Sequence, residues 1–312
     1  MDPSPIDFDQ PGHVLTVEQR RFYDKNGYLI IRNCLPRHEI ERYVKRFYEI
    51  CEGKDVPISM TVARDVSNPK LSSISAERSV SKLRDFNHDK VLFDYCKHPL
   101  VVDVVKDLIS FHPSDSIMSM HGMLINKPPD TGNLASRHPM HQDLAYFPFR
   151  PADYIVGAWT AMEKITRLNG CLEVVPGSHR TTGCLKVHGY PKWTKGVNPA
   201  YYGVVDFRPE DAELVHLEMD IGDTVFFHPL LLHGSGANRT DGFRKAISCH
   251  YANGSRCFYI DVKGTHQEEV EKTTMTLMKK RFNKIGNAQN INSYVDYFKF
   301  QSRPVNEKRA NL

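Results

Sequence analysis

The sequence contains no apolar run of about 18 residues, the length that a membrane-spanning helix requires, so no membrane span is predicted. Its seven cysteines are dispersed and form no CxxC pair, which disfavours a zinc knuckle or a disulfide framework and favours a reducing compartment. Lysine and arginine are scattered and the net charge is only +4, so no nucleic-acid partner is expected. The first residues, MDPSPIDFDQPG, have neither the basic start nor the apolar core of a secretory signal.

Helical patterns occur in the first third of the chain and again near its end. Thr16 followed by Gln19 is a capping-box pattern, which predicts a short helix that stops at Asn26-Gly27. After Pro36, apolar residues recur at helical spacing as far as Gly53, and residues 100–111 and 266–282 also have helical character. We expect the helices of the first third to be scaffold.

From about residue 115 the sequence changes to short β-type runs separated by Gly, Pro and Asn. Many short strands with turn signals and few helices are typical of a sandwich or barrel. The sequence therefore predicts a mainly β single domain with flanking helices, a double-stranded β-helix or jelly roll. Residues 1–112 are expected to be mostly helical scaffold, 113–262 the β core, and 263–312 a C-terminal helix and tail. The β-type runs are SIMSMHGMLI, YIVGAWTAM, CLEVV, VHLEM, TVFFH and RKAISCHYA.

The stretch RHPMHQDLAYFPFR contains a candidate pair of metal ligands, His141 and Asp143. In an extended segment residues i and i+2 point to the same side, so these two side chains project together and Gln142 turns away. An imidazole and a carboxylate on one side are two corners of the 2-His-1-carboxylate arrangement that binds ferrous iron. The spacing alone is common, because HxE triplets occur at 216–218 and 266–268, and a His–Asp hydrogen bond in a loop is the alternative.

The segment GDTVFFHPLLLHGSG offers two candidates for the third ligand, His228 and His233. Pro229 follows His228 and favours an extended backbone at His228, as part of a wall rather than of the site. We favour His233, because the glycines at 234 and 236 allow the backbone to approach the site closely.

Arg244 supplies the second half of the predicted site. It opens a strand in which one face carries arginine together with small residues, which is unusual for a core because arginine is almost never fully buried unpaired. A guanidinium group on such a face needs an anion, and its fork suits a carboxylate. These residues predict iron held by His141, Asp143 and His233, with 2-oxoglutarate chelating the metal and its far carboxylate paired with Arg244. The strand face comprises Arg244, Ala246, Ser248 and His250.

Long stretches of the chain from about residue 13 to its end resemble the phytanoyl-CoA dioxygenase family of iron- and 2-oxoglutarate-dependent oxygenases. The segments that carry the resemblance are HPMHQDLAYFPFRPADYIVGAWTAME, LINKPPDTG, HGYPKWTKGVN, GDTVFFHPLLLHGSG and GFRKAISCHYA. The resemblance implies a double-stranded β-helix, ferrous iron, 2-oxoglutarate, and L-ascorbate as the reductant that restores oxidised iron. Carried over by position, it implies the iron ligands His141, Asp143 and His233 and the co-substrate contacts Lys82, Met123, Gln142, Trp159, Ser235 and Arg244.

The resemblance also implies hydroxylation at C2 of a 3-methyl-branched fatty acyl-CoA such as phytanoyl-CoA, with O2 as oxidant, as the first step of peroxisomal α-oxidation. One alternative is the same oxygenase class acting on another acyl-CoA or a small metabolite. Another is a binding module that keeps the fold without activity, although all four principal residues are present. Halogenation is disfavoured, because Asp143 occupies the position that chloride would need.

The terminal residues Ala310-Asn311-Leu312 are a loose relative of the S-K-L peroxisomal signal. They predict a peroxisomal location through an import receptor, with the cytoplasm as the alternative. Substrate contacts are expected in loops such as residues 191–199.

Overall fold

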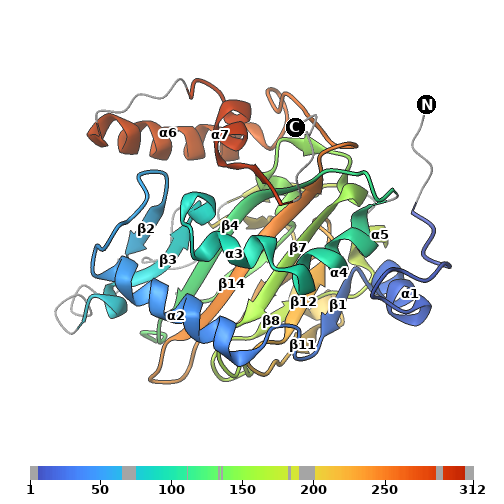
Figure 1. The fold of residues 1–312 in the computed structure, drawn as a ribbon, viewed down its shortest axis with the longest axis horizontal. Coiled ribbons are helices and arrows are strands. Elements are labelled where there is room, and N and C mark those ends of the chain that lie inside the picture. The colour runs from blue at the N-terminus through green and yellow to red at the C-terminus, as the bar shows by residue number, and fades with distance from the viewer. Residues whose placement is uncertain are drawn as a thin grey trace.

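The main feature of the fold is an eight-stranded antiparallel sheet, which crosses the molecule in Figure 1. The computed structural model describes residues 6–64, 75–110, 112–132, 134, 136–181, 184–189, 201–285 and 291–305. The sheet has the order β1 (Tyr28–Ile31), β12 (Thr224–Phe227), β7 (Ile155–Ala161), β14 (Arg244–Asn253), β4 (Ile117–Lys127), β3 (Val80–Arg84) and β2 (Thr61–Arg64), and β16 (Arg303–Pro304) pairs with β4.

A second, four-stranded sheet carries the other half of the β core. Its order is β11 (Val215–Leu217), β8 (Leu172–Val174), β13 (His233–Ser235) and β5 (His138–His141). Two short ladders accompany it: β9 (His188–Gly189) with β10 (Gly203–Val204), and β6 (Phe149–Arg150) with β15 (Phe258–Tyr259).

Apolar side chains from the two larger sheets pack into one cluster. Trp159, Phe227 and Ala246 come from the main sheet, and Leu172 and Leu217 come from the second sheet. Side chains alternate across a strand, so each sheet turns one face toward the other. This is the layout of the predicted double-stranded β-helix.

Helices cover the opposite face of the main sheet and one of its ends. In Figure 1, α2, α3 and α4 lie across the sheet, and α6 and α7 lie together beyond one end. Ile40, Phe47, Tyr95 and Val105 of the covering helices belong to the same buried cluster as Ile247 of the sheet. The helices are α1 (Val17–Asn26), α2 (Arg37–Cys51), α3 (Leu92–Lys97), α4 (Pro99–Ile109), α5 (Ser178–Thr181), α6 (Glu268–Ile285) and α7 (Tyr294–Gln301).

The helix ends follow the local sequence. Both reciprocal bonds of the Thr16–Gln19 capping box are present at the start of α1, and Gly27 ends the helix at φ 78°. A second capping box joins Ser293 and Asp296 at the start of α7. The side chains that cap these ends satisfy backbone N–H groups that have no partner within the helix.

The predicted helices and β-type runs each correspond to an observed element. Elements that were not predicted include β1, β2, β3 and α3 in the first 112 residues, β13 of the second sheet, and α7 near the end. The predicted boundary at residue 113 therefore does not separate helical scaffold from β core, because three strands before it belong to the main sheet.

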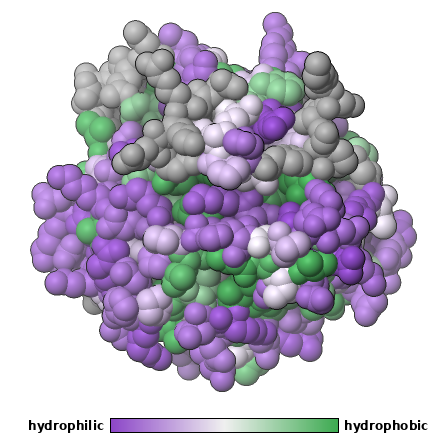
Figure 2. All heavy atoms as spheres, turned by 45° about the vertical axis from the view of Figure 1, so that its right-hand side comes forward, coloured by the Kyte–Doolittle hydropathy of each residue, from purple (hydrophilic) through white to green (hydrophobic). Residues whose placement is uncertain are grey.

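The described helices are all too short or too polar to cross a lipid bilayer. Figure 2 shows one side of the molecule as mostly hydrophilic, with apolar side chains gathered in its lower half.

Candidate metal centre and adjoining cavities

The three predicted iron ligands meet at one point between the sheets. One ligand atom from each of His141, Asp143 and His233 lies within 4.8 Å of the other two, and all three residues are buried. Antiparallel pairing of β5 with β13 places His141 directly opposite His233. Residues about ninety positions apart in the chain are therefore held together by the backbone of the second sheet.

Backbone hydrogen bonds fix the orientation of both imidazole rings. Nδ1 of His141 lies 2.8 Å from the carbonyl oxygen of Pro139, and Nδ1 of His233 lies 3.0 Å from that of Leu231. A carbonyl only accepts, so each Nδ1 carries the hydrogen and each Nε2 keeps its lone pair. Burial lowers the pKa of His233 to about 4, so this ring is neutral near pH 7 and ready to bind a metal.

Asp143 presents one carboxylate oxygen to these rings. Its Oδ1 lies 3.3 Å from Nε2 of His141 and 3.7 Å from Nε2 of His233. Its Oδ2 accepts a 2.7 Å hydrogen bond from Nε2 of His250 on β14. Burial opposes the charged carboxylate, but the neighbouring His250 and His233 hold its pKa well below the usual value. The site therefore offers two imidazole nitrogens and one carboxylate oxygen.

His228 is not part of this group. Its Nε2 lies 3.1 Å from Oδ1 of Asp153, and its Nδ1 accepts a hydrogen bond of 3.2 Å from the backbone N–H of Leu230. Both ring nitrogens are thus engaged away from the triad. This leaves His233 as the third member, as the sequence favoured.

A cavity of about 120 Å³ adjoins the triad and contains most of the predicted co-substrate residues. Arg244 lies within it, 2% exposed, with its guanidinium group 5.2 Å from the centre of the Trp159 ring. Nη2 donates to the carbonyl of Gly170 at 2.9 Å, whereas Nε and Nη1 have no hydrogen-bond partner in the described part of the chain. The predicted lining residues are Lys82, Met123, Trp159, Ser235 and Arg244.

The charge of Arg244 calls for an anion in this cavity. Burial lowers its pKa to about 10, which still leaves it charged at pH 7. Among the described residues no carboxylate lies within ion-pair distance of it. A buried cation without a partner is costly, so a carboxylate ligand with two oxygens suits the unpaired N–H groups.

Lys127 is a second buried base in the same cavity, and the sequence analysis missed it. Its Nζ donates to Oγ of Ser235 at 2.8 Å and to the carbonyl of Gly236 at 2.5 Å. Burial, followed by the nearby charge of Arg244, holds the pKa of Lys127 well below its usual value. The strand register is what would have revealed Lys127, since Lys127 on β4 lies directly opposite Arg244 on β14.

Gln142 departs from the site that the resemblance implies. Its side chain is buried outside the cavity lining and donates to the carbonyl of Leu230 at 2.8 Å, while its Oε1 accepts from the backbone of Lys186 at 2.8 Å. The i, i+2 rule explains this, because Gln142 has extended backbone angles and must face away from both neighbouring ligands. The structure thus shows the Gln142 side chain engaged outside the cavity, and a contact of Gln142 with the co-substrate stays a prediction.

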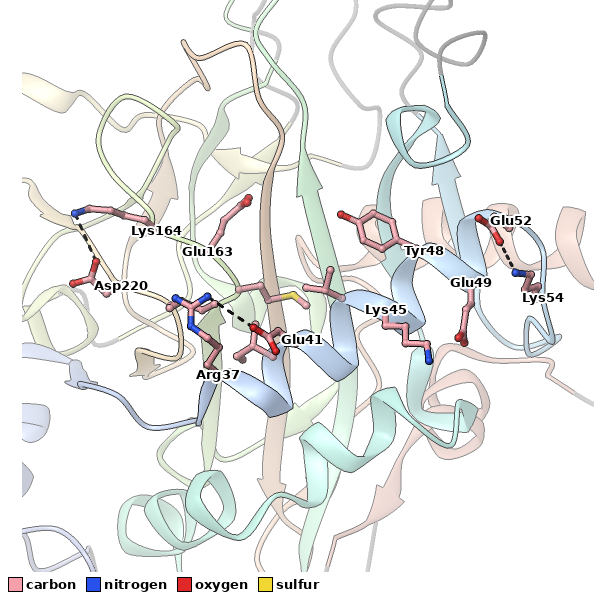
Figure 3. A pocket seen from close by; sticks show the side chains of 14 residues that line it. Arg37, Glu41, Lys45, Tyr48, Glu49, Glu52, Lys54, Glu163, Lys164 and Asp220 are labelled. Atoms are coloured by element: carbon pink, nitrogen blue, oxygen red, sulfur yellow. Dashed lines mark ion pairs between the residues drawn. The ribbon is translucent and has the colours of Figure 1, made fainter.

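Figure 3 shows a larger, open groove beside α2, which shares no lining residue with the cavity at the triad. Three ion pairs lie within it: Lys54 with Glu52 at 2.7 Å, Lys164 with Asp220 at 3.8 Å, and Arg37 with Glu41 at 3.9 Å. These pairs engage part of the groove's charge, and the candidate metal ligands lie instead at the triad.

Comparison with known proteins agrees with this geometry. A family model described as phytanoyl-CoA dioxygenase (PhyH) matches residues 23–246. The chain belongs to the phytanoyl-CoA dioxygenase family. A probable phytanoyl-CoA dioxygenase of Caenorhabditis elegans is 55% identical over 310 residues and covers 98% of each chain. The peroxisomal phytanoyl-CoA dioxygenase of Homo sapiens is 49% identical over 310 residues, 99% of this chain and 88% of the relative.

Solved structures support the fold at much lower identity. EctD from S. alaskensis in its apo form has a TM-score of 0.61 at 16% identity, covering 81% of this chain and 82% of its own. The epimerase SnoN, in complex with Fe3+, alpha ketoglutarate and nogalamycin RO, has a TM-score of 0.58 at 19% identity, covering 79% and 86%. These likenesses concern the double-stranded β-helix alone.

The residues of this family member fit iron and 2-oxoglutarate. Two imidazole nitrogens with one carboxylate oxygen form the ligand set that leaves open positions on ferrous iron. The unpaired N–H groups of Arg244 fit a carboxylate of the co-substrate. The family and the triad together make the protein a 2-oxoglutarate-dependent oxygenase.

Proposed function

We propose that the protein hydroxylates C2 of 3-methyl-branched fatty acyl-CoA, with phytanoyl-CoA as the substrate, in the first step of fatty acid α-oxidation. The observation that carries the proposal is the buried Arg244, with two unpaired N–H groups, in the cavity that also contains the triad. Support for the substrate comes from the 49–55% identity to relatives named phytanoyl-CoA dioxygenase over nearly the whole chain.

In this proposal His141, Asp143 and His233 hold ferrous iron, and Arg244 pairs with the far carboxylate of 2-oxoglutarate. The iron, when bound, supplies the oxidation, in which O2 gives one oxygen to succinate and one to the C2 hydroxyl while CO2 is released. Lys127 and Ser235 form a hydrogen-bonded pair that orients donors toward the same carboxylate. Trp159 covers the guanidinium group and keeps water from it.

The other predicted contacts complete the proposed site. Lys82 and Met123 line the cavity, and Nζ of Lys82 lies 4.9 Å from the centre of the Tyr201 ring. We assign them to the iron-chelating end of 2-oxoglutarate, because both also line the space next to His141 and Asp143. L-Ascorbate is the proposed reductant that returns oxidised iron to the ferrous state.

A peroxisomal location is part of the proposal. The relatives from Homo sapiens and Rattus norvegicus are both named peroxisomal phytanoyl-CoA dioxygenase. The predicted import signal, Ala310-Asn311-Leu312, lies outside the described residues, as does the loop 191–199. Fusion of the last twelve residues to a fluorescent protein tests the signal, and uniform cytoplasmic fluorescence would contradict it.

A matched pair of histidine variants tests the metal site. We expect His233→Ala to weaken Fe(II) binding by more than about 100-fold and to abolish phytanoyl-CoA-dependent succinate release, because a ligand is lost. His228→Gln should keep both, since His228 is bound to Asp153 and Leu230 instead. Anaerobic titration of Fe(II) with 2-oxoglutarate, followed by the visible absorption of the chelate, measures binding separately from turnover. Full turnover by Asp143→Ala would show that the ligand set is wrong.

A further inference from the structure

A second cavity, of about 110 Å³, reaches the metal centre along a different wall. It shares with the first cavity the residues around the triad, but it excludes Arg244, Lys127 and Ser235. Its own wall comes from β2, β3, β4, the segment after Asp143, and the two C-terminal helices. The residues that line only this second cavity are Ala63, Arg84, His121, Tyr146, Phe147, Thr274, Tyr294, Tyr297 and Phe298.

Helix α7 forms an aromatic wall that is fixed in place by hydrogen bonds at its tyrosines. The hydroxyl of Tyr297 donates to Oδ1 of Asp85 at 2.6 Å, and that of Tyr294 donates to the carbonyl of Tyr146 at 2.5 Å. Phe298 lies between them, with ring centres 5.2 Å from each tyrosine. Locked rotamers make this wall a preformed apolar surface.

The wall is also tied to the segment that carries Asp143. Gln267, just before α6, donates from Nε2 to the carbonyls of Leu144 at 2.8 Å and Phe147 at 3.1 Å. The C-terminal helices are thereby held at a set distance from the triad, as a surface that positions a substrate must be.

Two cations adjoin this apolar wall. Arg84 is half-buried and Lys82 is 9% exposed, and among the described residues neither lies within ion-pair distance of a carboxylate. Asp85, the nearest acid in sequence, faces Tyr297 and His121 instead. Rings on one side and an unpaired guanidinium group on the more exposed side fit a ligand with a hydrocarbon part and an anionic part.

We propose that this second cavity binds the acyl end of the acyl-CoA, an inference that rests on the proposed function. Its volume suits only the carbons next to the thioester, so C2 lies at the triad and the methyl branch at C3 contacts Phe298 and Tyr294. Arg84, at the more exposed edge, pairs with the anionic CoA portion. The first cavity takes the dicarboxylate, because the buried Arg244 lies there.

Steady-state kinetics of the full-length, iron-loaded protein test this assignment. Arg84→Met should raise the KM for phytanoyl-CoA about tenfold, the loss of one charge-assisted contact, with kcat little changed. The affinity for 2-oxoglutarate, read from the absorption of the anaerobic chelate, should stay within twofold. Arg37→Met, in the remote groove of Figure 3, is the matched control and should leave the KM for phytanoyl-CoA unchanged.

The aromatic wall has its own test. Phe298→Leu should reduce the preference for phytanoyl-CoA over straight-chain palmitoyl-CoA, measured as the ratio of kcat/KM values, by several-fold. If this variant does not fold, the kinetics of Arg84→Met still test the cavity assignment, because Arg84 is only half-buried. If the wild-type protein turns over phytanoyl-CoA and both variants have the same acyl-CoA kinetics as the wild type, the cavity assignment alone is overturned. A wild-type protein that binds iron and 2-oxoglutarate but hydroxylates no acyl-CoA overturns the proposed function and the assignment together.

Discussion

At the scale of single residues, the hydrogen bond from His250 to Asp143 decides which carboxylate oxygen faces the two imidazole ligands. Because Oδ2 is engaged at 2.7 Å, only Oδ1 is presented toward Nε2 of His141 and His233. A carboxylate held in this way binds a metal through one oxygen and leaves further positions open.

We therefore expect His250→Phe to weaken Fe(II) binding by about 10- to 100-fold, because the freed carboxylate can rotate. The absorption band of the Fe(II)–2-oxoglutarate chelate should also shift, a change that simple loss of stability does not produce. His250→Gln keeps a donor and should recover part of the affinity. Iron binding by His250→Phe at the wild-type level would contradict this role.

The residues of the triad could be predicted from the sequence, but their supporting partners could not. Extended backbone at Gln142 was enough to place His141 and Asp143 on one side. The role of His250 depends on a contact between residues 107 positions apart, which no local pattern specifies. Lys127 is similar, because only the register of β4 against β14 brings it beside Arg244.

At the scale of elements, the sequence predicted most strands of the β core but missed β3, whose polar side chains line cavities. In β3, VSKLR, the alternate Lys82 and Arg84 suggest a solvent-facing side, yet both line cavities. Helix α7, YVDYFKFQ, is rich in aromatic residues that favour strands, and the Ser293–Asp296 capping box starts it as a helix instead. Tertiary packing decided the case of β3, and packing cannot be read from a local window, whereas the capping box of α7 is a local signal that the sequence analysis missed.

The turn before β12 gives a prediction at this scale. Gly222 has φ +86°, and a Cβ there would lie 2.2 Å from the carbonyl oxygen of Leu35. The backbone at Leu35 cannot move away from Gly222 without losing a hydrogen bond, because the N–H of Leu35 donates to the carbonyl of Gly222 at 3.0 Å. We expect Gly222→Ala to lower the free energy of unfolding by more than about 2 kcal/mol, from strain and clash together.

Gly53 is the matched control, since it has a similar φ of +84° but nothing within 4 Å of an added Cβ. Gly53→Ala should cost only about 1 kcal/mol, from the left-handed backbone alone. Chemical denaturation of both variants measures the difference. Equal losses would show that the contact with Leu35 adds nothing.

At the scale of the whole molecule, burial lowers the pKa of several histidines. His188 is 8% exposed, donates from Nδ1 to the carbonyl of Lys186 and accepts at Nε2 from the N–H of Gln142 at 2.9 Å. Burial lowers the pKa of His188, and likewise that of His179, to about 4. Protonation would place a second hydrogen against the Gln142 donor, beside both metal ligands.

Stability should therefore fall as the pH drops from about 6.5 to about 4. In this window the unfolded chain binds protons that the folded protein does not, so the free energy of unfolding decreases with decreasing pH. His188 alone contributes at most about 1.4 kcal/mol per pH unit. His188→Gln should flatten the dependence, and His38→Gln, whose side chain is 77% exposed, should not. Thermal unfolding measured across this pH range tests the prediction. Equal slopes of stability against pH for the wild type, His188→Gln and His38→Gln would contradict it.

The two cavities share part of their walls, because Lys82, Met123 and Tyr201 line both. Any shift of these side chains on binding of one ligand changes the surface met by the other. Thermodynamic linkage then requires reciprocity: whatever factor the dicarboxylate applies to acyl-CoA affinity, acyl-CoA must apply to the dicarboxylate. The shared side chains would thus make binding of the two ligands cooperative, so that either one reports the presence of the other.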